Sequence, residues 1–223
     1  MGEESKKYKL MRLDNFEGMQ LSGTTYNMVI GLVLLWGFAI NALMAYSFTG
    51  YILRMHYAAV IIAYLVLGLG GTFVVFRSKN PGISFLGFTM LAVGMGLILT
   101  YFITAYDEHS IHLAFVLTAI VTLTVMAVSM IFPQFFLGIG KVLFISLLCA
   151  LGVDLLAAFV FHANLSIMDY VVVVIFAGYI GFDWARAQAY PKVLDNAIDS
   201  AADIYVDIVN IFIRILAIVG KKD

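Results

Sequence analysis

Six long apolar runs, separated by short polar breaks, constrain this chain more than any other feature. They cover about 26–48, 56–76, 82–105, 112–132, 138–161 and 168–186. A helix of about 20 apolar residues is long enough to cross the hydrocarbon core of a bilayer. The breaks carry charge or turn formers, as between Arg77 and Pro81. The pattern therefore predicts six membrane-spanning helices.

The composition excludes a soluble fold. Of the 223 residues, 63% are hydrophobic and 12% are charged, whereas a soluble domain is about half apolar and a quarter charged. The net charge of −1 argues against a nucleic-acid partner, because phosphates require a basic surface. The single cysteine, Cys149, excludes a disulfide within the chain and disfavours a thiolate metal site. The expected partner of the surface is the lipid bilayer.

A seventh segment, about 197–219, mixes apolar residues with Asp199, Asp203, Asp207 and Arg214. Charged side chains are too costly for a helix that faces lipid on all sides. We therefore expect this segment to be a central helix enclosed by the other six. The predicted fold is an all-α integral membrane protein of seven transmembrane helices, a single domain over 1–223 with a polar segment at 1–25 on the inner surface.

The distribution of Lys and Arg predicts the orientation. With the N-terminus inside, the outer loops between helices hold only Arg54, while Lys221 and Lys222 at the C-terminus are a mild conflict. The inner side then holds Lys6, Lys7, Lys9, Arg12, Arg77, Lys79, Lys141, Arg186 and Lys192. This asymmetry favours a cytoplasmic N-terminus.

Two carboxylates stand inside apolar sequence, where a charge is expensive. Asp183 lies near the inner end of the sixth run, and Asp207 lies about two and a half turns into the seventh. A connection of about ten residues joins these helices, so we expect the two side chains to meet in the inner half of the bundle. Two carboxylates within hydrogen-bonding distance share a proton, which makes such a pair a pH-sensitive latch.

The latch also suggests a cation. When Asp183 and Asp207 lose their proton, they repel each other or turn to a hard cation such as Ca²⁺, so the pair is also a candidate transient calcium site. Arg77, at the inner end of the second run, is a candidate competitor for one carboxylate when the latch opens. No resident cofactor is expected, since Ca²⁺ would be the permeant ion.

Four aspartates recur every four residues and so share one face of the seventh helix: Asp195, Asp199, Asp203 and Asp207. For Asp195 and Asp199 we expect a solvated inner end, where acids favour a helix N-terminus. This interpretation fails for Asp207, which apolar residues surround on both sides.

Asp154 and Arg214 come to a similar depth in the fifth and seventh helices, which predicts a buried ion pair. Two roles stay open for the pair: a lock between two helices, or a gate.

The outer face gathers four histidines together with Asp107, Glu108 and Asp169 in the predicted orientation. The histidines are His56, His109, His112 and His162. An acidic vestibule that gathers cations fits this set better than a metal site does. Five glycines are expected to mark close helix contacts: Gly68, Gly70, Gly71, Gly94 and Gly96.

Two segments of the last third share one order of residues with a known family. The first is Gly178-Tyr-Ile-Gly-Phe-Asp183, and after a short polar loop the second runs from Ile204 to Leu216. The pattern of an aromatic residue before Asp, then a second Asp, Asn, Phe and a late Arg, resembles the Bax inhibitor family, the transmembrane Bax inhibitor motif proteins. The matching positions are Asp183, Asp207, Asn210, Phe212 and Arg214.

The resemblance implies a pH-sensitive calcium leak in which the two aspartates form latch and sensor, with the seventh helix enclosed by six others. The compact chain is similar to bacterial members, which implies the plasma membrane. Two features depart from the family pattern: the second helix lacks the acidic residue that some members carry, and Asp154 is not part of the pattern.

Three other functions compete with the leak. A non-conducting regulator would bind other membrane proteins, such as quality-control proteases. An intramembrane aspartyl protease would need Gly-x-Gly-Asp where Ile204-Tyr-Val-Asp207 stands, so we do not expect an enzyme. A proton-coupled exchanger would use the same latch, although the chain shows no inverted repeat.

Overall fold

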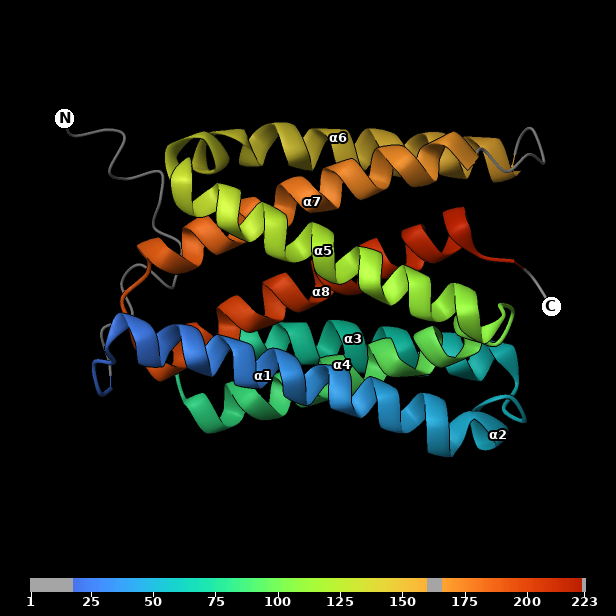
Figure 1. Ribbon diagram of the computed structural model, residues 1–223. Coiled ribbons are helices and arrows are strands. Elements are labelled where there is room, and N and C mark those ends of the chain that lie inside the picture. The colour runs from blue at the N-terminus through green and yellow to red at the C-terminus, as the bar shows by residue number, and fades with distance from the viewer. Residues whose placement is uncertain (1–17, 160–165, 222–223) are drawn as a thin grey trace. The chain divides into compact units, whose positions relative to one another are not determined.

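The computed structural model describes residues 18–159 and 166–221, which are almost entirely helical (Figure 1). Within these ranges the β-structure is limited to isolated bridge residues, which include the pair Gln20 and Val193. The helical elements are α1 (Gly23–Leu43), the π-helical segment η2 (Met44–Phe48), α2 (Thr49–Ile52), α3 (Tyr57–Arg77), α4 (Pro81–Ile103), α5 (Glu108–Ile131), α6 (Pro133–Phe159), α7 (Ser166–Ala189) and α8 (Leu194–Val219).

Each of the seven predicted helices corresponds to a helix in the described residues. The first is continuous from Gly23 to Ile52, because α1, η2 and α2 follow without a break. Among the described residues, six helices are long and apolar enough to cross a membrane, and α8 is not one of them. The polar segment with Lys6, Lys7, Lys9 and Arg12 lies outside the described residues, as do His162 and Lys222.

The connection between α7 and α8 is shorter than the predicted ten residues, because α7 continues to Ala189 and α8 starts at Leu194. Lys192 explains the longer α7. Its Nζ donates hydrogen bonds to the carbonyls of Ala187 at 3.0 Å and Gln188 at 2.7 Å. Because the last carbonyls of a helix lack partners within it, a cation there stabilises the final turn.

The chain forms two compact units, and α8 contributes to both. The first unit consists of the described residues up to Phe102 together with Ala187–Tyr205. The second consists of the described residues from Ile103 to Arg186 together with those from Val206 onward.

In the first unit, α3 and α4 pack with their backbones in contact. A Cβ added at Gly71 would lie 2.5 Å from the Leu91 nitrogen, and one at Gly94 would lie 2.8 Å from the Gly68 nitrogen. Small residues allow membrane helices to approach this closely. The prediction of close contacts is confirmed for Gly71 and for the pair Gly68 and Gly94. It is wrong for Gly70, where a Cβ would meet only the end of Met90 at 3.9 Å.

Gly96 makes its close contact with α1 and η2 instead. A Cβ there would lie 2.5 Å from the Met44 sulfur and 2.9 Å from Asn41 Oδ1. Asn41 in turn donates a 2.7 Å hydrogen bond to the Tyr205 hydroxyl in the first half of α8. Tyr205 also packs against the rings of Phe38 and Phe88, so α1, α4 and the first half of α8 share one core.

In the second unit, two glycines of α7 pack against large side chains of α6. A Cβ added at Gly181 would lie 2.1 Å from the Phe136 ring, and one at Gly178 would lie 2.6 Å from Leu143. The α5 residue Ser129 donates a 2.6 Å hydrogen bond to the Gly181 carbonyl. These contacts fix the part of α7 that carries Asp183.

Candidate functional site

Asp183 lies in the last third of α7 and is 8% exposed. Arg186, one turn later in the same helix, donates a 3.1 Å hydrogen bond from Nη1 to Asp183 Oδ1. The Arg186 guanidinium also lies over the Phe182 ring, 5.0 Å from its centroid. The positively charged partner of Asp183 therefore comes from the same helix. Residues three apart on a helix are neighbours, so the spacing of Asp183 and Arg186 in the sequence is itself a signal for this contact.

Asp207 lies in the part of α8 that belongs to the second unit and is 5% exposed. Tyr179, one turn before Asp183 in α7, has its hydroxyl within electrostatic range of both Asp207 and Asp183. Both predicted carboxylates therefore belong to the second unit, and the charge of each acts on Tyr179. The direct hydrogen bond between the two carboxylates stays a prediction, as does a transient calcium site there.

Arg77 ends α3 in the first unit and is exposed. Asp183 and Asp207 belong to the second unit. The competition of Arg77 for one of these carboxylates therefore stays a prediction.

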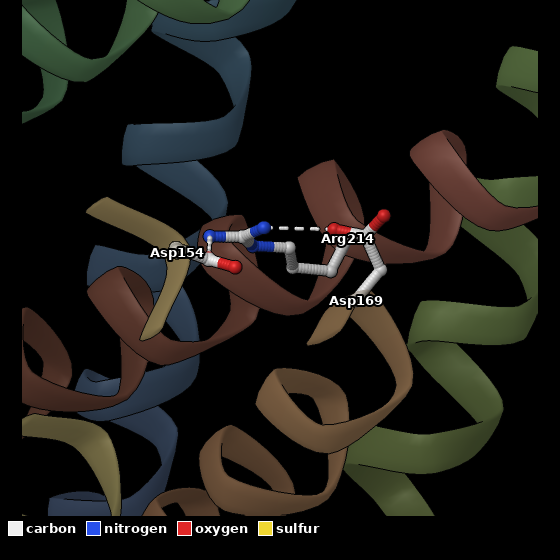
Figure 2. Close-up of polar contacts among 3 residues, drawn as sticks. All are labelled: Asp154, Asp169 and Arg214. Atoms are coloured by element: carbon white, nitrogen blue, oxygen red, sulfur yellow. Dashed lines mark hydrogen bonds and ion pairs between the residues drawn. The ribbon is translucent and has the colours of Figure 1, made fainter. Parts of the chain in front are cut away.

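Arg214, late in α8, binds two carboxylates from two other helices (Figure 2). Its Nη2 donates to Asp154 Oδ2 of α6 at 3.3 Å, and its Nη1 donates to Asp169 Oδ1 in the first turn of α7 at 2.7 Å. The structure thus brings the predicted partners Asp154 and Arg214 together. It also shows that Asp169, which was predicted to belong to the outer vestibule, is the closer partner of Arg214.

The environment of this ion cluster differs from the prediction. The side chains of Arg214, Asp154 and Asp169 are 28%, 26% and 20% exposed, so the pair is half-buried rather than buried. One guanidinium faces two carboxylates, which leaves an excess of negative charge. Burial, and then the nearby charge of Asp169, raise the pKa of the Tyr106 hydroxyl above its ordinary value of 10.0. The charge of Asp169 therefore acts on Tyr106 as well as on Arg214.

Comparison with known proteins decides the family. The family model described as "Inhibitor of apoptosis-promoting Bax1" matches residues 19–223. This chain belongs to the Bax inhibitor-1 family. It is also 25% identical over 173 residues to uncharacterized membrane proteins from two strains of Streptococcus pyogenes serotype M3, and the match covers 74% of this chain and 74% of each relative. The family, the relatives and the apolar helices together identify the chain as a multi-pass membrane protein.

The remaining positions of the Bax inhibitor motif also lie in α8. Asn210 donates a 2.8 Å hydrogen bond from Nδ2 to the carbonyl of Val206, so its amide is bound to its own helix. Phe212 is half-buried on the same helix. Both residues thus belong to the segment that carries Asp207 and Arg214.

The prediction that Asp195 and Asp199 form a solvated helix end is wrong. They are 2% and 3% exposed in the first unit. Ser84 of α4 donates a 2.6 Å hydrogen bond to Asp195 Oδ1. Tyr26 of α1 donates to the carbonyl of Asn196 at 3.2 Å, which packs the same turn against α1. The four-residue spacing is the same for solvated and buried acids, so the sequence pattern did not distinguish them.

The described histidines lie at helix starts. His56 precedes α3, and its Nδ1 accepts a 3.3 Å hydrogen bond from the Ala58 nitrogen, while His109 and His112 belong to the start of α5. Within residues 18–159 and 166–221, no group of three or more His, Cys, Asp or Glu side chains is arranged to hold a metal ion.

Proposed function

We propose that this protein is a pH-sensitive leak for hard cations such as Ca²⁺, gated by the protonation of Asp183 and Asp207. One observation carries the proposal: two carboxylates from α7 and α8, 8% and 5% exposed, lie inside one unit of a membrane protein, and both interact electrostatically with Tyr179. A carboxylate that is shielded from water needs a proton, a cation or a partner, so its state depends on pH and on cations.

The position of α8 supports this function. From Asp195 to Val219, no residue of the helix is exposed, although Asp199, Asp203, Asp207 and Arg214 lie on it. We propose that the other six helices enclose α8 and that the path for the cation follows its polar side chains. Intramembrane charges that are kept away from lipid commonly mark ion pathways.

The proposed setting follows from the charge asymmetry of the loops. The chain would lie in the plasma membrane with a cytoplasmic N-terminus, since the outer loops between helices hold Arg54 alone. Protons would act as the regulator, and no resident cofactor or enzymatic activity is proposed.

Reconstitution tests the function directly. The purified protein is placed in liposomes that contain a calcium-sensitive dye, and calcium entry is measured at pH 6, 7 and 8 against empty liposomes. The proposal expects entry above the empty-liposome rate, with a rate that depends on pH. Well-folded protein that gives no entry at any pH would overturn it, and a non-conducting regulator of membrane proteins would then be favoured.

A further inference from the structure

One face of α5 carries a stripe of small, mostly hydroxylated side chains through the second unit. The stripe consists of Ser110, Ala114, Thr118, Thr122 and Ser129, which are the buried residues of this helix. Residues four or seven apart share one helix face. The opposite side of α5 carries exposed apolar side chains, including Val116, Ile120 and Leu123. The polar face of this spanning helix therefore points into the protein.

Both ends of the stripe lie beside the charged groups of the second unit. At the start of α5, Ser110 Oγ donates to Asp107 Oδ2 at 3.0 Å and accepts a 3.0 Å hydrogen bond from the Lys221 nitrogen. At the other end, Ser129 Oγ donates to the Gly181 carbonyl, two residues before Asp183. The stripe thus connects the charged end of α5 with the segment that carries the proposed sensor.

Thr122, within the stripe, differs from three other threonines of the spanning helices and resembles Thr100 of α4, whose buried hydroxyl also has no hydrogen-bond partner among the described residues. Thr72, Thr89 and Thr118 each donate their hydroxyl proton to the carbonyl four residues earlier. This is the usual way for a threonine in an apolar helix to satisfy its hydroxyl. Thr122 is only 7% exposed, yet among the described residues its hydroxyl has no hydrogen-bond partner.

A buried hydroxyl without a partner is costly, and such groups commonly bind water or an ion. Hard cations prefer oxygen ligands and keep part of their water shell. We propose that this face of α5 is the water-lined wall of the cation path and that the Thr122 hydroxyl contacts the passing hydrated cation. The inference rests on the proposed function, to which it adds one wall of the cation path and a residue that contacts the passing ion.

The proposal that this face of α5 lines a water-filled path can be tested without a flux measurement, by asking whether a small cation reaches position 122. In the full chain with Cys149→Ser, a cysteine is introduced at Thr122 or at Leu123, which is 69% exposed on the apolar side of the same helix. The reconstituted protein is treated with Ag⁺, a permeant-sized cation that binds thiols, and the remaining free thiol is counted after denaturation. We expect Ag⁺ to protect the thiol of Thr122→Cys and to leave that of Leu123→Cys free. A free thiol in Thr122→Cys would contradict the proposal that this face of α5 lines a water-filled path.

Flux tests the role of the hydroxyl. Thr122→Val keeps the shape of the side chain and should slow calcium entry about fivefold, which is the effect of one lost hydrogen bond. Thr122→Ser should restore it, and Thr118→Val is the matched control, because its hydroxyl is already bound to its own helix. Equal rates for Thr122→Val and the unchanged protein would overturn the role of Thr122. An unchanged protein that gives no entry would instead overturn the proposed function, while the Ag⁺ result still decides whether the wall is hydrated.

Discussion

Arg214 donates a 2.7 Å hydrogen bond to Asp169, which joins the late part of α8 to the first turn of α7. The same guanidinium reaches Asp154 of α6 at 3.3 Å. Three helices of the second unit are therefore tied together through one side chain. The two contacts differ in length, so their contributions to stability should also differ.

Asp169→Asn should destabilise the protein more than Asp154→Asn. The loss for Asp169→Asn should be about 1–2 kcal/mol, between the values for exposed and buried ion pairs, because both side chains of this pair are less than a third exposed. Either substitution relieves the repulsion between the two carboxylates, but Asp154→Asn breaks only the longer bond, so its loss should be smaller. Thermal unfolding in detergent micelles measures both. An equal or larger loss for Asp154→Asn would contradict this ranking.

Gly181→Ala should destabilise the second unit, because the new methyl group would lie 2.1 Å from the Phe136 ring. Overpacking of this kind costs about 1–3 kcal/mol. The matched control is Gly138→Ala in α6, where a Cβ would meet nothing within 4 Å. Thermal unfolding of both variants checks the difference, and Phe136→Leu should recover part of the stability of Gly181→Ala. A Gly181→Ala variant as stable as the control would show that the α6–α7 contact is looser than described.

Much of the fold could be predicted from the sequence, since hydropathy located six spans and the charges of the segment around Asp207 identified α8 as different. The predicted first helix, 26–48, stopped short of Ile52 because the π-helical segment Met44–Phe48 has no signature in hydropathy. The connection before α8 was predicted too long because the bonds of Lys192 to the end of α7 cannot be read from composition.

The pH dependence of α5 can be tested at its N-cap. The Ser110 backbone N–H donates to Asp107 Oδ1 at 2.8 Å, and this bond, more than any other cause, lowers the pKa of Asp107 below its ordinary value of 3.8. A folded-state pKa that is lowered contributes stability above the unfolded pKa, and this stability is lost as pH falls through the folded pKa. Asp107→Ala should therefore lower the unfolding temperature at pH 7, and the gap to the unchanged protein should narrow below about pH 4.

Glu108→Ala is the control for this experiment, because Glu108 lies in the first turn of α5 but is not the N-cap. Its unfolding temperature at pH 7 should change less. A gap for Asp107→Ala that is constant from pH 7 to pH 3 would contradict the role of the ionised cap.

For the candidate site, the sequence predicted the residues better than their contacts. It paired Asp154 with Arg214 by helical rise, yet Asp169 was assigned to the vestibule because its depth in the membrane placed it near the outer face. Likewise, Arg186 was counted only for the charge of the inner side, although it lies one turn after Asp183. Partners of this kind depend on side-chain direction, which periodicity does not give.

The central claim is that protonation of Asp183 and Asp207 gates a cation leak. Calcium entry into liposomes should be measured from pH 6 to pH 8 for the unchanged protein, Asp183→Asn and Asp207→Asn. Asparagine is uncharged at every pH and resembles a protonated carboxyl group. Each variant should therefore lose the pH dependence and give, throughout the range, a rate close to that of the unchanged protein at its acidic limit. A pH dependence that persists unchanged in both variants would contradict the claim.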